Sequence, residues 1–292
     1  MKPILLIGSS GQLGADLVTA LAPLGAVVAC DRHALDLAQP EAIISKVREI
    51  APSIIVNAAA YTAVDRAESE SVLAHAVNAT APAVLATEAK RTGALLVHYS
   101  TDYVFDGEKT AAYVESDAPN PRNVYGSSKL AGERAILESG AEHLIFRTSW
   151  VYSAHGANFL RTMLRLATVR SELKVINDQF GAPTAAIDLA QATVAALLKR
   201  RETNGINGLF HLSAGGSTTW FDYADTLFKL ALPAEARPRL IPISTAEYAA
   251  PAARPRNSIL SNAKFNSSFG IALPHWQDSV RECLKVLAAG AG

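Results

Sequence analysis

Tyr125 and Lys129 are the two residues whose types and spacing could do chemistry as a pair. They lie four positions apart, just after Pro121, where a helix could begin. Residues i and i+4 share one face of a helix, so the ammonium group can sit beside the phenol. A neighbouring cation favours the phenolate, and we predict that Lys129 lowers the pKa of Tyr125 from its ordinary ~10. The pair is a candidate acid–base unit.

This spacing alone also fits an ordinary helix with a surface lysine, because short motifs recur by chance. The start of the chain supplies a second observation. Ile4 to Ile7 is a continuous apolar run, as expected for a strand buried on both faces of a parallel sheet. Gly8, Gly11 and Gly14 follow at the start of a helix that reaches about Leu24.

A strand, a glycine turn and a helix in this order predict a dinucleotide site. Gly8 permits the tight turn, Gly11 lets the backbone approach a pyrophosphate, and Gly14 lets the helix pack on the strand. The amide groups at the helix start, around Gln12 and Leu13, then face the phosphates. The alternative is a glycine-rich turn without a ligand.

A second strand, Ala26 to Cys30, ends at Asp31 and Arg32. An acid at this place binds the ribose hydroxyls of NAD, whereas an arginine accommodates the 2′-phosphate of NADP. Both residue types are present, so the sequence does not choose between NADH and NADPH. Asp36 and Leu37 are predicted to lie under the adenine; the alternative for Asp36 is an acid at a helix start.

The pattern of strands and helices continues from there. A helix at about Pro40 to Ile50, a strand at Ser53 to Asn57, a long helix at about Ser69 to Arg91 and a strand at Ala94 to Ser100 are predicted. These repeats predict an α/β fold with a Rossmann-type, doubly wound parallel sheet. Ala60, Tyr61 and Thr62 follow the third strand, where small residues let a dinucleotide approach; Tyr61 and Thr62 could equally be structural.

Ligands in such sheets bind beyond the carboxyl ends of the strands. Thr101 and Asp102 follow the fourth strand and are therefore positioned for chemistry, with a turn acid as the alternative for Asp102. Trp150 lies at the exit of a fifth strand, His143 to Thr148, where it could stack on a sugar or a base, or belong to the core.

The second half of the chain has a weaker rhythm. Helices are predicted at Ala157 to Thr168, Ile187 to Arg200, Trp220 to Ala231 and Trp276 to Leu287, and strands at Gly208 to Leu212 and Leu240 to Ile243. We predict a Rossmann domain over residues 1–150, with some later segments packing back on it. A smaller α/β substrate lobe is predicted over residues 151–292.

Composition excludes several classes of protein. The 292 residues carry a formal net charge of zero without a basic block, so nothing indicates nucleic acid or an anionic membrane surface. The N-terminal apolar run is too short for a signal peptide or a membrane span. Cys30 and Cys283 form no CxxC pair and no disulfide framework. These features predict a cytoplasmic protein.

Taken together, the motifs resemble the extended short-chain dehydrogenases that act on nucleotide sugars, and within them the family of dTDP-4-dehydrorhamnose reductases. The glycine and Tyr/Lys elements mark only the superfamily, whereas Trp150 and the run from Asn177 to Thr184 are more specific. The resemblance runs from Ile4 to the C-terminal helix and rests on Gly8-x-x-Gly11-Gln12-x-Gly14, Ile55 to Asp65, His98 to Phe105, Tyr125-Gly126-x-x-Lys129 to Glu133, Phe146 to Tyr152 and Asn177 to Thr184.

This resemblance implies reduction of the 4-keto group of dTDP-4-dehydro-β-L-rhamnose to dTDP-L-rhamnose, the last step of dTDP-rhamnose biosynthesis, with NADPH or NADH. It implies Tyr125, Lys129 and Thr101 as catalytic residues, and Thr101, Asp102, Trp150 and Arg254 as the residues that face the sugar nucleotide. A surface role is the alternative for Arg254. The residues implied to line the cofactor are Gly8, Gly11, Gln12, Leu13, Gly14, Asp31, Asp36, Leu37, Ala60, Tyr61, Thr62, Tyr99, Tyr125 and Lys129.

Some members of the family share Mg²⁺ across a dimer interface through acidic residues. Asp16 fits one of these places, but Ile187 and Val286 fall where the other acids are expected. Hard cations need several oxygen ligands. We therefore predict weak or absent structural Mg²⁺, no metal ligands, and a monomer or a homodimer of another kind.

Two other functions compete with this one. A nucleotide-sugar dehydratase or epimerase of the same fold is the first, but a dehydratase carries a second carboxylate after the threonine and aspartate, where this chain has Tyr103. The second is a non-catalytic dinucleotide-binding subunit that resembles the β subunit of methionine adenosyltransferase, in which the Tyr/Lys pair can persist.

Overall fold

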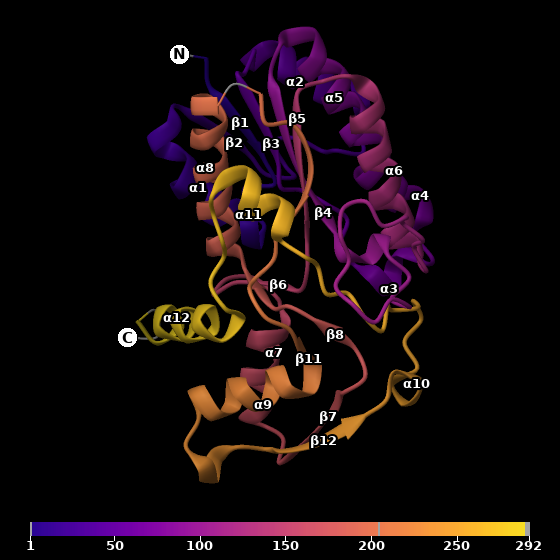
Figure 1. Ribbon diagram of the computed structural model, residues 1–292, viewed down its shortest axis with the longest axis vertical. Helices are drawn as coiled ribbons and strands as arrows, with labels where there is room; N and C mark the ends of the chain where they lie inside the picture. The colour runs from indigo at the N-terminus through magenta and orange to yellow at the C-terminus, as the bar shows by residue number, and fades with distance from the viewer. Residues whose placement is uncertain (1, 204, 290–292) are drawn as a thin grey trace.

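A six-stranded parallel sheet forms the centre of the molecule (Figure 1). The computed structural model describes residues 2–203 and 205–289. The strands, in the order in which they lie side by side, are β10 (Gly208–His211), β5 (His143–Thr148), β4 (Leu95–Thr101), β3 (Ile54–Asn57), β1 (Ile4–Ile7) and β2 (Val27–Cys30). The predicted α/β class with a doubly wound parallel sheet is confirmed.

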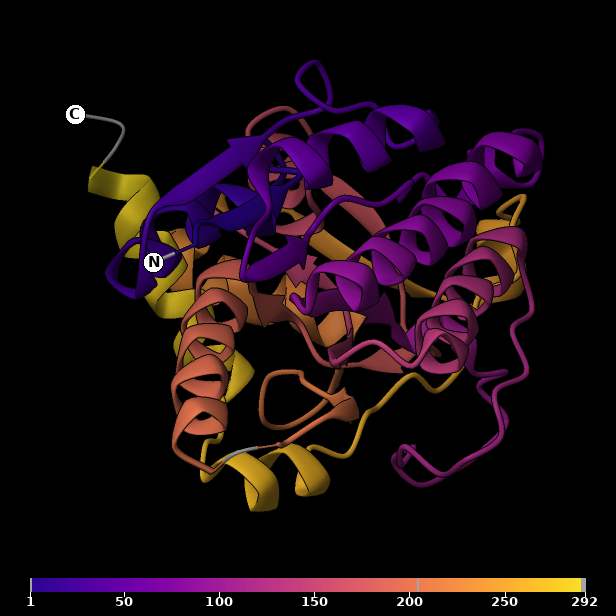
Figure 2. The same ribbon diagram turned by 90° about the horizontal axis from the view of Figure 1, so that it is seen from above.

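Helices cover both faces of this sheet (Figure 1, Figure 2). One face carries α1 (Gln12–Leu21), α8 (Ala186–Thr203) and α11 (Ala263–Phe269), and the other carries α2 (Pro40–Ile50), α5 (Ala81–Thr92) and α6 (Val124–Ser139). Alternate residues of β1 enter the two cores, as the strand period of two requires. Each fully buried aliphatic side chain stabilises the fold by roughly 1.5–3 kcal/mol.

The long helix predicted over Ser69 to Arg91 contains a π-helical stretch. It is composed of α4 (Ser71–His75), η2 (Ala76–Thr80) and α5, and a separate short helix, α3 (Val64–Ala67), precedes it. Pro82, at the start of α5, has no N–H to donate to the preceding turn, and its ring would clash there. The wider π turn before it accommodates the ring. Such π-helical turns often occur at functional sites.

A second lobe lies beyond the carboxyl ends of the strands (Figure 1). Its core brings together Tyr152, Leu160, Tyr223 and Trp276. Its helices are α7 (Phe159–Ala167), α9 (Trp220–Ala231), α10 (Thr245–Tyr248) and α12 (Trp276–Ala289). Three strand pairs complete it: β7 (Glu172–Ile176) with β12 (Arg239–Ile243), β6 (Val151–Tyr152) with β9 (Thr184–Ala185), and β8 (Phe180–Gly181) with β11 (Thr218–Thr219).

The chain returns to the sheet after it has entered this lobe. β10, α8 and α11 follow residue 150 and pack on the sheet or in it. The division at residue 150 stays a prediction. Short 3₁₀ turns occur at η1 (Ala22–Leu24), η3 (Asp102–Val104) and η4 (Ala234–Ala236). Within the described ranges, no helix has both the length and the apolar character that crossing a membrane requires.

Candidate active site

The start of α6 places Tyr125 in the first turn of the helix. Asn123 is the N-cap residue, and its side-chain oxygen accepts a hydrogen bond from the Gly126 amide at 2.7 Å. This bond satisfies one of the amide groups that a helix start leaves free. The amide nitrogen of Asn123 donates to the Ala253 carbonyl at 2.7 Å, which ties the helix start to the C-terminal loop.

Two glycines let α6 approach the rest of the site closely. A Cβ on Gly126 would lie 2.2 Å from the Tyr103 carbonyl oxygen, and one on Gly132 would lie 2.1 Å from the Asn78 carbonyl oxygen. Any larger residue would push the helix away from η3 and from the π-helical turn. The Asn78 side chain also donates to Ser128 Oγ at 3.0 Å. These contacts therefore fix the position of α6, and with it the face that carries Tyr125 and Lys129.

The Tyr125 phenol lies beside Thr101, Asp102 and the Tyr103 ring. Burial raises its pKa to about 12, a neighbouring Thr101 hydroxyl opposes the rise, and the Asp102 carboxylate adds to it. The prediction that Lys129 lowers the pKa of Tyr125 is therefore wrong for this arrangement. The neutral phenol is the form that a proton donor needs, so the raised pKa keeps Tyr125 competent as a general acid at neutral pH.

The Lys129 amine contacts groups other than the Tyr125 phenol. Nζ donates to the Tyr99 carbonyl oxygen at 2.6 Å and lies 3.1 Å from His98 Nε2. The residue is 1% exposed. Burial lowers the pKa of Lys129 to about 8, against the opposing effect of Glu133. The lysine charge is thus partly suppressed and directed away from Tyr125, which explains why it does not lower the pKa of the phenol.

Thr101 and Asp102 form a buried pair at the end of β4. Thr101 Oγ1 donates to Asp102 Oδ1 at 2.9 Å and accepts a hydrogen bond from the Tyr103 amide at 3.1 Å. Burial raises the pKa of Asp102 to about 6, although hydroxyl groups nearby oppose this. Among the described residues, Asp102 Oδ2 has no hydrogen-bond partner. Asp102 is 2% exposed, and the hydroxyl groups of Ser149 and Ser258 lie near its carboxylate, so contact of this oxygen with a substrate stays a prediction.

A cavity of about 380 Å³ extends from the glycine turn to Tyr125 and Lys129. Every predicted cofactor residue lines it except Gly14, which lies behind the turn. Thr101, Asp102, Trp150 and Arg254 do not line it. Arg32, which the sequence analysis considered for the 2′-phosphate of NADP, also lines it. The lining residues that were not named as cofactor residues are Ile7, Ser10, Leu35, Ala58, Ala59, Leu73, Val77, Ser100, Thr148 and Val151.

The glycine turn has the geometry of a phosphate cradle. Gly8 has φ +87°, and a Cβ on it would lie 2.7 Å from the Ala59 amide nitrogen. A Cβ on Gly14 would lie 1.9 Å from the Gly8 carbonyl oxygen, so helix and turn touch directly. Gly11 caps α1 without a side chain, which leaves the first amide groups of the helix to face the cavity. These residues fit a dinucleotide pyrophosphate.

The far end of the cavity carries Asp31 and Arg32. Asp31 Oδ1 accepts hydrogen bonds from the amides of His33 and Ala34, both at 2.9 Å. These bonds fix the carboxylate at the end of β2, where it can meet ribose hydroxyls. Asp36 Oδ1 accepts from the Ala38 amide at 3.0 Å and so caps a turn, while the residue still lines the cavity.

Trp150 and Arg254 lie outside this cavity. Trp150 has φ +47°, a strained backbone conformation for a residue with a side chain. Its indole stacks on Trp220 with ring centroids 3.6 Å apart. The Arg254 guanidinium pairs with Asp65 at 2.8 Å and lies 6.0 Å from the centroid of the Tyr248 ring. Contact of either residue with a sugar nucleotide stays a prediction.

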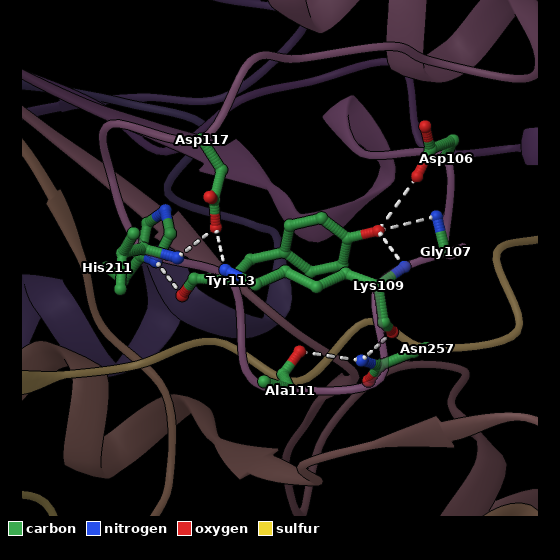
Figure 3. A network of polar contacts seen from close by, with 9 residues as sticks. Asp106, Gly107, Lys109, Ala111, Tyr113, Asp117, His211 and Asn257 are labelled. Carbon is green, nitrogen blue, oxygen red and sulfur yellow. Dashed lines mark hydrogen bonds and ion pairs between the residues drawn. The ribbon is translucent and has the colours of Figure 1, made fainter.

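A buried network ties the loop after η3 to the C-terminal loop that carries Arg254 (Figure 3). Tyr113 OH donates to Asp106 Oδ1 at 2.8 Å and accepts from the Gly107 amide at 3.0 Å. The Asn257 amide nitrogen donates to the carbonyl oxygens of Lys109 at 2.7 Å and of Ala111 at 2.9 Å. Both loops border η3 and α6, so the network holds the rim of the site together.

The residues considered for a metal do not converge. Within the described part of the chain, no group of three or more His, Cys, Asp or Glu side chains could hold a metal ion. Asp16 is half-buried, and burial raises its pKa. Ile187 and Val286 are 43% and 55% exposed. The weak or absent binding of Mg²⁺ stays a prediction.

Three buried polar residues near the site were missed as candidates: Asn57, Asn78 and His98. Asn78 accepts a hydrogen bond from the Tyr61 amide at 2.8 Å and holds the loop after β3. Asn57 and His98 lie on adjacent strands and contact each other at 3.1 Å. The available signals were a polar residue at the end of an apolar strand for Asn57 and a polar residue in the middle of a buried strand for His98.

Comparisons with known proteins place the chain in a family. A family model described as the RmlD substrate binding domain matches residues 1–289. The dTDP-4-dehydrorhamnose reductase of Escherichia coli (strain K12) is 50% identical, with 97% of each chain covered. That of Burkholderia thailandensis is 47% identical, with 97% of this chain and 98% of the relative covered. The chain therefore belongs to the family whose model is described as the RmlD substrate binding domain.

A solved member of the RmlD family shares the fold described above. The crystal structure of dTDP-4-dehydrorhamnose reductase from Bacillus anthracis, in complex with NADP, has a TM-score of 0.90 and 35% identity. It covers 98% of this chain and 99% of its own. The expected family resemblance is confirmed over the full length of the described residues.

Proposed function

We propose that this chain is a dTDP-4-dehydrorhamnose reductase, which reduces the 4-keto group of dTDP-4-dehydro-β-L-rhamnose with NADPH or NADH. The observation that carries the proposal is that Tyr125 and Lys129 line the same cavity as the glycine turn. A proton donor and a dinucleotide cradle therefore share one space. The two relatives that cover 97% of this chain carry this enzyme name, and a solved relative is a complex with NADP.

Tyr125, Thr101 and Asp102 each have a separate role in the proposed reaction. The bound reduced nicotinamide supplies a hydride to C4 of the sugar. Tyr125 protonates the carbonyl oxygen as negative charge develops on it, a contribution typically worth ~10²–10⁴-fold. Thr101, next to the phenol, orients the same oxygen and helps to stabilise its charge. Asp102 accepts a hydrogen bond from a hydroxyl group of the substrate. Its Oδ2 has no hydrogen-bond partner among the described residues.

Lys129 and the residues along the cavity hold the cofactor. The amide groups at the start of α1 bind the pyrophosphate. Asp31 binds the adenosine ribose, and Lys129 binds the nicotinamide ribose. We further propose that Trp150 packs against the sugar nucleotide and that Arg254 meets its diphosphate after exchanging its present partner Asp65.

A dehydratase or epimerase of the same fold is the second candidate. Its support is the likeness to UDP-glucose 4-epimerase from Thermus thermophilus, which at 20% identity and a TM-score of 0.79 shows the fold alone. Tyr103 occupies the place of the second acid of a dehydratase, and its phenol is buried, which raises its pKa. Such a side chain cannot replace a carboxylate as a base.

The decisive experiment offers dTDP-4-dehydro-β-L-rhamnose to the purified protein with NADPH and, separately, with NADH. The absorbance of the reduced nicotinamide is followed, and the product is identified by chromatography. We expect one nicotinamide oxidised for each dTDP-L-rhamnose formed. A dehydratase or epimerase recycles its nicotinamide, so turnover without net oxidation would contradict the proposal, as would no turnover at all with tight co-purification of another enzyme.

We also infer that the protein acts in the cytoplasm, as a monomer or a homodimer. Cys30 and Cys283 are free and buried, which suits a reducing compartment. Light scattering with and without EDTA tests the assembly, and a dimer that EDTA dissociates would contradict the prediction of weak or absent Mg²⁺.

A further inference from the structure

Asn57 and His98 form a buried polar chain behind Lys129 that the reaction described above does not use. All three side chains are 1% exposed. Neither Asn57 nor His98 lines the cofactor cavity. A polar group is costly to bury unless it is hydrogen-bonded, and in this chain the partners of Asn57 and His98 lead to Lys129.

The direction of each hydrogen bond can be followed from one fixed donor. The Ala59 amide donates to Asn57 Oδ1 at 3.2 Å. This bond orients the side-chain amide, so that its NH₂ group faces His98 Nδ1 at 3.1 Å. An NH₂ group can only donate, and Nδ1 must therefore accept. The single proton of the neutral imidazole ring is then on Nε2.

The proton on His98 Nε2 points at Lys129. The two nitrogens are 3.1 Å apart. An ammonium group has three donors and no lone pair, so it cannot accept this bond. A neutral amine can accept from Nε2 while it donates to the Tyr99 carbonyl oxygen, 2.6 Å away. The donor and acceptor roles that follow from the Ala59 bond therefore favour the neutral form of Lys129.

The charges around the pair agree with this assignment. Glu133, on the same helix as Lys129, is the nearest acid, but Arg147 on β5 holds it at 2.6 Å in a buried ion pair. Its charge is therefore largely compensated. Burial lowers the pKa of Lys129 to about 8, and burial is the largest cause that lowers the pKa of His98 well below its usual value. Burial therefore favours the neutral form of both groups.

We propose that Asn57 and His98 are positioning residues that stabilise the neutral amine form of Lys129 in the free enzyme, and that cofactor binding favours its charged form. When ribose hydroxyls draw Nζ away from His98 Nε2, the amine lone pair takes a proton from solvent and becomes an ammonium group. The step forms one N–H bond on Nζ and breaks the bond that held this proton in a hydronium ion or a buffer acid in the solvent. It rests on the proposed function only in that Lys129 binds the cofactor.

The tautomer of His98 directly tests the first part of the proposal, which concerns the free enzyme. Histidine labelled with nitrogen-15 is incorporated into the full-length protein, and ring nitrogen signals are recorded by NMR without cofactor. The His98→Gln variant identifies the signals that belong to His98. We expect a neutral ring with the proton on Nε2. A proton on Nδ1, or on both ring nitrogens, would overturn the assignment whatever the protein catalyses.

Asn57→Asp reverses the direction of the hydrogen bonds from residue 57 through His98 to Lys129, while the size of the side chain stays nearly the same. A carboxylate accepts at both oxygens, so it keeps the Ala59 bond and requires a proton on Nδ1. Nε2 then becomes an acceptor, and Lys129 stays an ammonium group in the free enzyme. Asn257→Asp is the matched control, because Asn257 is also buried and its side chain bonds Lys109 and Ala111, away from Lys129.

Proton uptake on NADPH binding is the second measurement. Calorimetric titrations at about pH 9 in buffers of different ionisation enthalpy give the number of protons taken up. Since the lysine is then mostly neutral, we expect about one proton for the wild type and for Asn257→Asp, and about none for Asn57→Asp. No uptake by the wild type, or equal uptake by Asn57→Asp, would overturn the proposal. Absence of NADPH binding would instead contradict the proposed function.

Discussion

The indole of Trp150 lies flat on the indole of Trp220, with ring planes 8° from parallel and centroids 3.6 Å apart. Trp220 in turn contacts the Phe159 ring at 4.6 Å, so the stack is anchored in the second lobe. The backbone of Trp150 is held at φ +47°. Strain of this kind persists where the surroundings determine it, often at ligand sites. The stack therefore presents a rigid aromatic wall beyond β5.

Gly181→Ala should disturb this wall without touching the cofactor. A Cβ on Gly181 would lie 2.4 Å from the Trp150 ring, so the indole must move. We expect KM for the dTDP-sugar to rise by at least about tenfold, about 1.4 kcal/mol, with the Kd for NADPH unchanged. Gly215→Ala is the control, since its Cβ would meet its neighbours at 3.4 Å or more. An unchanged KM for the dTDP-sugar in Gly181→Ala would show that Trp150 does not contact the substrate.

Asp102 should make the protein less stable as the pH rises. Burial raises its pKa to about 6 in the folded state, above the ~3.9 of an unfolded chain. The folded state therefore binds more protons between about pH 4 and pH 6, and stability is lost as the pH rises through this window. Above it, the buried carboxylate costs about 2–3 kcal/mol.

Asp102→Asn tests this cost by urea unfolding at about pH 4 and about pH 7. We expect the difference in unfolding free energy between the two pH values to shift by about 2–3 kcal/mol relative to the wild type, in favour of the variant at the higher pH. Comparing differences removes any constant effect of the new amide. Parallel pH profiles of the two proteins would show that Asp102 titrates normally.

Gly14→Ala and Gly11→Ala should separate the fold of the glycine turn from its binding role. A Cβ on Gly14 would lie 1.9 Å from the Gly8 carbonyl oxygen, whereas one on Gly11 would lie 3.3 Å from the same atom. We expect Gly14→Ala to lose at least about 1–3 kcal/mol of stability. Gly11→Ala should fold like the wild type but bind NADPH at least about tenfold more weakly, as measured by fluorescence titration. Equal stability of both variants would contradict the direct contact at Gly14.

The sheet and the cofactor cavity could be predicted from the sequence because their signals are local. The apolar run of β1, the glycine spacing and the acid after β2 are each readable within a few residues. The alternation of strands and helices with right-handed crossovers then predicts a doubly wound parallel sheet. The return of β10 to the edge of the sheet could not be predicted, since a four-residue strand carries no mark of its partner.

The environment of the Tyr/Lys pair depended on contacts between distant segments. Helical spacing predicted that Lys129 and Tyr125 share a face, and both do line the cavity. The spacing could not show that His98 and the Tyr99 carbonyl oxygen take the amine. These partners lie on β4, about 30 residues earlier, and only packing reveals them. For that reason, the predicted lowering of the Tyr125 pKa by Lys129 was wrong.

The central claim is that the Tyr125 hydroxyl gives its proton to the substrate, and Tyr125→Phe tests it most directly. The variant is compared with the wild type for NADPH affinity and for kcat with dTDP-4-dehydro-β-L-rhamnose. We predict an unchanged Kd for NADPH and a kcat lower by about 10²–10⁴-fold, because the lost interaction forms mainly in the transition state. Wild-type turnover by Tyr125→Phe would contradict the account.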